Sequence, residues 1–321
     1  MGESFKNPTP WNEFYEKAWL NRQQIMSSII ESGETHPLRV ISIFSSILRF
    51  SSEELKSDQE SEHDNRFVCD TDSKYIKSDI RNVKIVNNGG CINIIPHENL
   101  PAGMLADHRF AHRNKYNIGS SYSDCDKIAF VTDYCRHRKF DAIIELGSGY
   151  SQNLIKLFYQ GGPKVPYFGG EFTQSGTECA QMLSNLSDEI NLTPFRFDFR
   201  QPDLSNIPRF ERVLVFTNHA IEQVNHIPDN LLLEIASVAR QVTCIHMEPF
   251  GFQMAPAENE SDVDKKHREY FRGNGWNENL FNQLANHSCK GNIDLQYVGK
   301  NILGGSDFHN PSSLALWKTG F

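Results

Sequence analysis

The chain has 321 residues, enough for one large domain or for one domain with an appendage. Its net charge of −8, from 32 basic and 40 acidic side chains, argues against general binding to nucleic acid or to an anionic membrane. The seven cysteines are scattered, without a C-x-x-C pair, and the longest apolar stretch, Leu38 to Phe50, is too short to span a bilayer. We therefore expect a cytoplasmic protein with no disulfide framework, no membrane partner and no nucleic-acid partner.

Residues 1–119 are expected to form an accessory region of helices and a β-hairpin. Apolar residues at helical spacing predict helices at 11–30 and 38–50, and a polar, acidic composition predicts a loop at 51–64. Alternating residues on both sides of Asn87 to Gly90 predict a hairpin of Val83–Val86 with Cys91–Ile95.

Residues 101–118 concentrate His, Arg and Tyr side chains. One interpretation is a solvated basic helix or loop, and the other is a lid whose His108 and His112, with the nearby Tyr122, contact a substrate. The two histidines are four residues apart, but arginine follows the first one where the H-E-x-x-H zinc motif has glutamate. We therefore predict no metal. A helix at 123–137 should lead into the next domain.

Residues 120–321 are expected to form the second domain. A glycine turn follows its first strand. Ala142 to Ile144 is a continuous apolar run, typical of a buried parallel strand, and apolar residues in 152–160 have helical spacing. Gly147 and Gly149 lie between them. Strand, glycine turn and helix together bring backbone N–H groups up to a cofactor.

The sequence from Glu145 to Tyr150, E-L-G-S-G-Y, resembles the first motif of class I S-adenosylmethionine-dependent methyltransferases, in which an acidic residue precedes G-x-G. The dinucleotide fingerprint needs a third glycine, and Gln152 stands at that position, so an NAD-dependent oxidoreductase is a distant alternative. An ordinary tight turn between strand and helix is the structural alternative.

Strand and helix patterns alternate through the rest of the domain. Strands are predicted at 165–170, 192–199, 212–217 and 242–247, helices at 177–186, 230–240, 267–272 and 276–284, a polar mobile stretch at 255–264, and a final hairpin of 293–303 with 313–318. We expect an α/β fold with a doubly wound, mostly parallel seven-stranded sheet that ends in an antiparallel hairpin, preceded by the helical and hairpin accessory region. This layout resembles class I methyltransferases over residues ~120–321.

A carboxylate at the end of the second strand, Glu171, can accept both hydroxyls of a ribose. The family resemblance further implies that Asp198 bonds the adenine amino group beside Phe199, although Arg196 and Arg200 could instead pair with Asp198. The full set of cofactor residues implied is Glu145, Gly147, Ser148, Gly149, Glu171, Phe172, Asp198, Phe199, Thr217 and Asn218, with S-adenosylmethionine as the cofactor.

The stretch after the fourth strand, 217–224, resembles the H-x-L-E-H motif of small-molecule methyltransferases, with Ile221 and Gln223 as departures. His219 is the candidate general base, because imidazole titrates near neutral pH, and Glu222 is the second candidate catalytic residue. His219 could instead only pack beside the cofactor. Glu248 and Phe250, around the E-P pair after the fifth strand, are candidate substrate residues, although Glu248 could also pair with Arg268.

The resemblance implies methyl transfer to an oxygen, in preference to a nitrogen, of a small metabolite or sugar-like acceptor in small-molecule biosynthesis. Metal-dependent relatives carry acids after strand four, where Thr217 and Asn218 stand here, so no metal is expected. The alternative is a catalytically inactive protein that binds S-adenosylmethionine or another nucleoside in a regulatory or scaffold role. The expected partner is the small acceptor, and a homodimer is left open.

Overall fold

The computed structural model describes residues 9–45, 83–88, 91–96, 120–255, 260–303 and 312–320. The chain divides into two compact units, Met1–Asn114 with Thr173–Glu189, and Lys115–Phe172 with Ile190–Phe321. The segment 173–189, which the sequence assigns to the cofactor domain, is thus part of the first unit. The expected loop at 51–64 and the expected lid at 101–118 lie outside the described residues.

The first unit contains the predicted helix and hairpin. Its elements are α1 (Thr9–Glu31), helical residues 37–45, the antiparallel pair β1 (Val83–Asn88) and β2 (Cys91–Pro96), and α8 (Gln174–Ser184). The Glu16 carboxylate on α1 accepts the backbone N–H groups of Gln174 (2.9 Å) and Ser175 (2.8 Å). These N–H groups have no partner inside α8, so a carboxylate there both caps the helix and complements its dipole.

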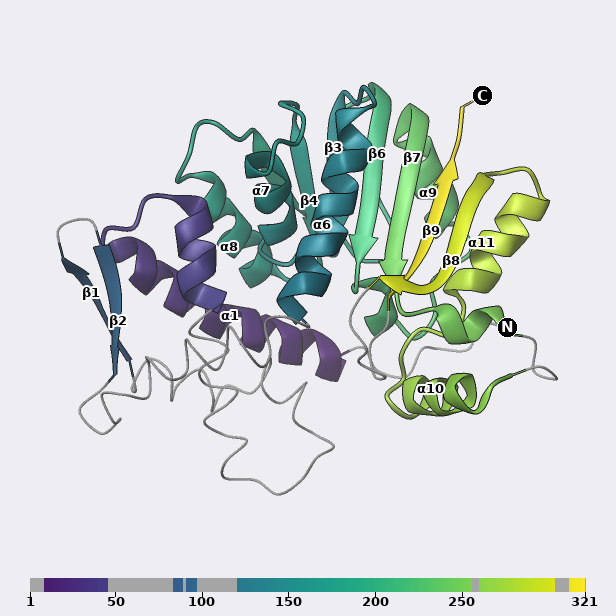
Figure 1. The fold of residues 1–321 in the computed structure, drawn as a ribbon, viewed down its shortest axis with the longest axis horizontal. Helices are drawn as coiled ribbons and strands as arrows, with labels where there is room; N and C mark the ends of the chain where they lie inside the picture. The colour runs from purple at the N-terminus through teal and green to yellow at the C-terminus, as the bar shows by residue number, and fades with distance from the viewer. Residues whose placement is uncertain are drawn as a thin grey trace. The chain divides into compact units, whose positions relative to one another are not determined.

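A seven-stranded sheet forms the centre of the second unit (Figure 1). Its strands are β3 (Ala142–Leu146), β4 (Tyr167–Glu171), β5 (Leu192–Arg196), β6 (Phe210–Asn218), β7 (Ala239–Glu248), β8 (Asp294–Leu303) and β9 (Ser312–Lys318). The order is β5-β4-β3-β6-β7-β9-β8, with β3 to β7 parallel and β9 antiparallel to both of its neighbours. The predicted doubly wound sheet with a terminal hairpin is confirmed.

Helices cover both faces of this sheet. Figure 1 shows α6 (Ser120–Arg136) and α7 (Gln152–Tyr159) on one face, and α9 (Leu231–Ser237) and α11 (Leu280–Cys289) on the other. On the second face Ile144, Val215 and Cys244 pack with Leu231 and Leu284 in one apolar core. The short α7 follows the predicted spacing, with Leu154, Ile155 and Leu157 buried.

The starts of α10 (Asp262–Gly273) and α11 differ most from the sequence prediction. α10 begins inside the stretch that was expected to be mobile, because the Ser261 hydroxyl accepts the N–H of Asp264 and caps it. α11 begins at Leu280 instead of Trp276, because the Asn277 side-chain oxygen accepts the N–H groups of Asn279 and Leu280 and holds a turn ahead of the helix.

The topology places the candidate residues together at the carboxyl ends of the parallel strands, which we call the carboxyl edge of the sheet. β3 is the first strand in sequence and lies between β4 and β6, so the chain runs to opposite sides of β3. In open α/β sheets, ligands bind in the crevice that forms outside the carboxyl ends of the strands at such a reversal. The segments that follow β3, β4, β5 and β6 all begin at this edge.

Candidate functional site

The glycine turn after β3 is tightly enclosed. Gly147 and Gly149 have φ angles of 76° and 54°, which favour glycine. A Cβ on Gly147 would lie 2.2 Å from the Cβ of Ala220 and 3.2 Å from the ring of Phe199. The turn after β3 therefore meets the segments that follow β6 and β5, and only glycine fits at the meeting point.

Glu145, the acid ahead of the turn, is buried with one oxygen bonded and one without a partner. Its Oε1 accepts the Asn153 side-chain N–H at 2.7 Å, while its solvent-inaccessible Oε2 has no partner among the described residues. Burial raises the pKa of Glu145 to about 8, against the lowering effect of Asn153 and Lys156. An unsatisfied buried carboxylate oxygen is costly, and a cationic ligand group would satisfy it.

Glu171, at the end of β4, faces the same turn. Its Oε2 accepts the backbone N–H of Gly149 at 2.9 Å, and the residue is 7% exposed. Ser148 is also buried, and its N–H donates to the Gly170 carbonyl oxygen at 2.9 Å. The structure thus joins the two acids and the two glycines around one turn.

Asp198 and Phe199, which the family resemblance places beside the adenine, both contact other side chains of the chain. Asp198 takes a bidentate salt bridge from Arg200, with Nη2 to Oδ2 at 2.8 Å and Nε to Oδ1 at 2.9 Å. The Arg200 guanidinium also lies 4.7 Å from the centre of the Phe172 ring. Phe199 is buried and packs edge-on against Phe197. The pairing of Asp198 with Arg200, left open by the sequence, is therefore present, and the adenine role stays a prediction.

His219 lies between an acid and a hydroxyl. Its Nδ1 is 3.0 Å from Glu222 Oε2, and its Nε2 is 2.5 Å from Ser312 Oγ at the start of β9. An ionised carboxylate can only accept, so Nδ1 carries the proton and Nε2 accepts from the serine hydroxyl. This Ser–His–acid order allows His219 to withdraw a proton through Ser312.

Glu248 holds the backbone on which His219 sits. Its buried carboxylate accepts the N–H groups of Ala220 (3.1 Å), Ile221 (3.3 Å) and Glu222 (3.3 Å). Burial raises the pKa of Glu248, and the neighbouring Glu222 carboxylate raises it further. The sequence alternative that Glu248 pairs with Arg268 is wrong, because Arg268 instead binds Glu260, with Nε to Oε1 at 2.7 Å.

A chain of buried polar groups continues from Glu248 into the core. Thr217 bonds to the Glu248 carboxylate, and its Oγ1 lies 3.0 Å from His246 Nδ1. The indole N–H of Trp317 donates to His246 Nε2 at 3.0 Å, so Nδ1–H points to Thr217. Burial lowers the pKa of His246 to about 3, which keeps it neutral. Thr217, expected at the cofactor, is thus fully buried and supports the turn.

The remaining candidate residues have mixed positions. Asn218 Oδ1 is buried without a partner among the described residues, while Phe250 is buried and stacks on Phe281 with ring centres 6.2 Å apart. Tyr122 lies within α6, but its side chain, like His108 and His112, is outside the described residues.

Sequence reasoning missed Ser312 and Asn153. Ser312 begins a strand 93 positions after His219, and no local pattern links them. Asn153 could have been found, because it lies in the first turn of the helix that follows the glycines and so faces back toward Glu145.

Among the described residues, no group of three His, Cys, Asp or Glu side chains is arranged to hold a metal ion, and no helix has the length and apolar character needed to cross a bilayer.

A scan against protein-family models finds no match, and a search of curated proteins finds no relative. Among solved structures, the plantazolicin methyltransferase BpumL in complex with SAH is similar at 14% identity and a TM-score of 0.41, covering 66% of this chain and 88% of that one. The magnesium protoporphyrin IX methyltransferase ChlM from Synechocystis PCC 6803 is similar at 14% identity and a TM-score of 0.41, covering 69% of this chain and 90% of that one. The CcbJ methyltransferase from Streptomyces caelestis is similar at 12% identity and a TM-score of 0.40, covering 61% of this chain and 88% of that one.

Numbered within the sheet, the strand order is 3-2-1-4-5-7-6, with only the last strand in sequence antiparallel to its neighbours. The second unit therefore has a doubly wound, Rossmann-like fold that ends in an antiparallel hairpin.

Proposed function

We propose that this chain binds S-adenosylmethionine at the carboxyl edge of the sheet and transfers its methyl group to a small molecule. The observation that carries the proposal is the buried Oε2 of Glu145, which has no partner among the described residues, beside a glycine turn that Glu171 also contacts. S-adenosylmethionine offers an ammonium group, a ribose and an adenine, which match a buried acid, a strand-end acid and an apolar ring.

In this proposal each part of the cofactor has a group in the chain to hold it. Glu145 accepts the ammonium, Glu171 accepts the ribose hydroxyls, and Phe199 with Asp198 borders the adenine. The sulfonium of the bound cofactor supplies an activated methyl group and a good leaving group. The chain contributes orientation, exclusion of water and control of the acceptor's proton.

In this proposal the acceptor's proton leaves through Ser312, whose side chain is fully buried, and then His219. As the new bond to the methyl carbon forms, the acceptor O–H breaks and its proton passes to Ser312 Oγ, whose own proton moves to His219 Nε2. Glu222, on Nδ1, stabilises the imidazolium that results. Such a relay suits a neutral hydroxyl, which must lose a proton on methylation, and this favours oxygen over nitrogen as the acceptor atom.

The test is turnover with the full-length chain and methyl-labelled S-adenosylmethionine. A panel of sugars, hydroxylated small metabolites and matched amines serves as acceptors, and mass spectrometry reads the gain of a methyl group. The proposal expects transfer to hydroxyl compounds that depends on His219, while His226→Ala, the same change at an exposed histidine in the following loop, leaves turnover unchanged. Donor binding without transfer to any acceptor would instead favour the regulatory binding protein.

A further inference from the structure

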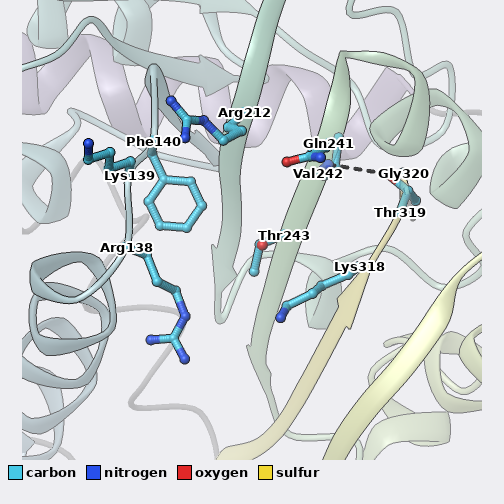
Figure 2. Close-up of a pocket in the computed structure, with 10 residues that line it drawn as sticks. All are labelled: Arg138, Lys139, Phe140, Arg212, Gln241, Val242, Thr243, Lys318, Thr319 and Gly320. Carbon is cyan, nitrogen blue, oxygen red and sulfur yellow. Dashed lines mark hydrogen bonds between the residues drawn. The ribbon is translucent and has the colours of Figure 1, made fainter.

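A cavity of about 240 Å³ lies at the end of the sheet where the parallel strands begin, opposite the glycine turn (Figure 2). We call it the basic pocket. Its lining includes Arg138, Lys139, Phe140, Arg212, Thr243 and Lys318. Arg138 and Lys139 follow α6, Arg212 lies near the start of β6, and Lys318 ends the antiparallel β9. Four cations from three separate parts of the sequence thus line one cavity, in a chain whose net charge is −8.

The two arginines are held in place by the protein. The Arg138 guanidinium carbon lies 3.7 Å from the centre of the Tyr134 ring, and Arg138 Nη1 donates to the Tyr134 carbonyl oxygen at 3.2 Å. Arg212 Nη2 donates to Asp141 Oδ1 at 3.2 Å, and its hydrogen bond to Asp141 lowers the pKa of that carboxyl. Side chains fixed in advance lose less conformational entropy when they bind a ligand.

Both arginines keep donors for a ligand. A guanidinium has five N–H groups, and the contacts with Tyr134 and Asp141 leave most of them unused. The Nε–H of Arg212 is buried from solvent and has no acceptor within the described part of the chain, so it is not one of these donors. A planar guanidinium group with free N–H donors matches the spacing of the oxygens in a phosphate group.

Among residues 9–45, 120–255, 260–303 and 312–320, neither Lys139 nor Lys318 forms a salt bridge with a carboxylate, although Asp294 lies opposite Lys318 in the β8–β9 pairing. The pocket lining contains no acidic side chain, and the neighbouring Asp141 pairs with Arg212. Cations that line one cavity without an acidic side chain among them favour a ligand with two or more negative charges.

We propose that the basic pocket binds a small soluble ligand bearing a phosphate ester or a pyrophosphate. The cavity is smaller than the usual range for drug-sized ligands, which fits one or two phosphate groups. The Thr243 hydroxyl and the Gln241 amide add uncharged donors, and the Phe140 ring adds an apolar group to the lining (Figure 2). The site is separate from the glycine turn and does not depend on the proposed methyl transfer.

The test is calorimetric titration of pyrophosphate into the full-length chain at ~10 mM ionic strength, where screening is weak. We expect saturable binding that weakens at about 0.5 M salt. The double variant Lys139→Gln/Lys318→Gln should lose affinity about tenfold or more, and Arg212→Lys should lose several-fold because the charge stays but the planar guanidinium group is lost. The matched control is Lys265→Gln/Lys266→Gln on α10, which removes the same charge from exposed positions and should bind like the parent.

Three results would overturn the proposal. One is no saturable binding of pyrophosphate by the parent at low salt. Another is equal loss of affinity in the pocket and control double variants, which would show a response to net charge alone. The third is binding to vesicles that contain phosphatidic acid without binding to soluble pyrophosphate, which would identify a membrane headgroup as the ligand. Thermal melting of each variant verifies that the fold is intact.

Discussion

The two ends of the parallel strands carry opposite kinds of ionisable side chain, acids at the carboxyl end and bases at the other, and hold them in different ways. At the carboxyl edge, Glu145, Glu171 and Glu248 are 1%, 7% and 1% exposed, and backbone or amide N–H groups bind all three. At the opposite edge, Arg138 and Lys139 are exposed. Buried acids with fixed donors define one position for a ligand or a turn, whereas exposed cations attract anions with less dependence on geometry. The variants below test whether the two edges act separately.

The largest expected effect is at His219. Replacing it by Ala should lower methyl-transfer turnover about 10²–10⁴-fold, the size of a proton-transfer contribution, with little change in donor affinity. Steady-state kinetics measures the turnover, and calorimetric titration of the donor measures its affinity.

Variants of the two partners refine this prediction. Ser312→Ala should reduce turnover less than His219→Ala, because the base remains while the relay is lost. Glu222→Gln should reduce turnover less than His219→Ala, since it removes only the charge that stabilises the imidazolium. If Ser312→Ala turns over as fast as the parent, the proton does not pass through that hydroxyl, and a loss of tenfold or less at His219 would leave orientation as the whole mechanism.

A smaller effect is expected at Glu171. Glu171→Ala should weaken S-adenosylmethionine binding by about 2–3 kcal/mol, the cost of losing charge-assisted hydrogen bonds to two hydroxyls. Calorimetric titration measures the affinity, and Glu269→Ala, at an exposed glutamate on α10, is the matched control. An affinity within twofold of the parent would show that another group holds the ribose.

The sequence predicted the sheet well because a doubly wound fold leaves local signals. Apolar runs such as Ala142 to Ile144 identify the strands, and Gly147 and Gly149 identify the turn. The side-chain partners were less predictable, because they depend on residues far apart in the chain. Glu248 was expected at the substrate or on Arg268, and its bonds to the 220–222 backbone follow from the way the ends of β6 and β7 lie side by side.

The free energy of unfolding should respond to Glu145 in a pH-dependent way. Its pKa in the folded chain is raised to about 8 from an ordinary 4.5. Between these two values the carboxyl group ionises in the unfolded chain but stays protonated in the folded chain. The free energy of unfolding therefore falls as pH rises from 4.5 toward 8, and Glu145 has no such effect below pH 4.5. Glu145→Gln should therefore raise the melting temperature at pH 8 by about 2 °C or more and change it less at pH 5. A difference that is equal at both pH values, or that matches Glu269→Gln, would show that Glu145 ionises normally.

The smallest effects are expected when each edge is tested with the ligand of the other. Lys139→Gln/Lys318→Gln should bind S-adenosylmethionine like the parent, and Glu171→Ala should bind pyrophosphate like the parent, because the residues lie at opposite ends of the parallel strands. Paired titrations measure both affinities in the same preparations. A change of more than about threefold in either cross-titration would show that the edges are coupled, with a coupling energy obtained from the ratio.

The most direct test of the central claim is titration of S-adenosylmethionine into the full-length chain, with NAD⁺ titrated in parallel. The account predicts one S-adenosylmethionine site per chain, and no NAD⁺ binding, because Gln152 stands where the dinucleotide fingerprint needs a third glycine. Binding of NAD⁺ in preference to S-adenosylmethionine, or of neither, would contradict the account.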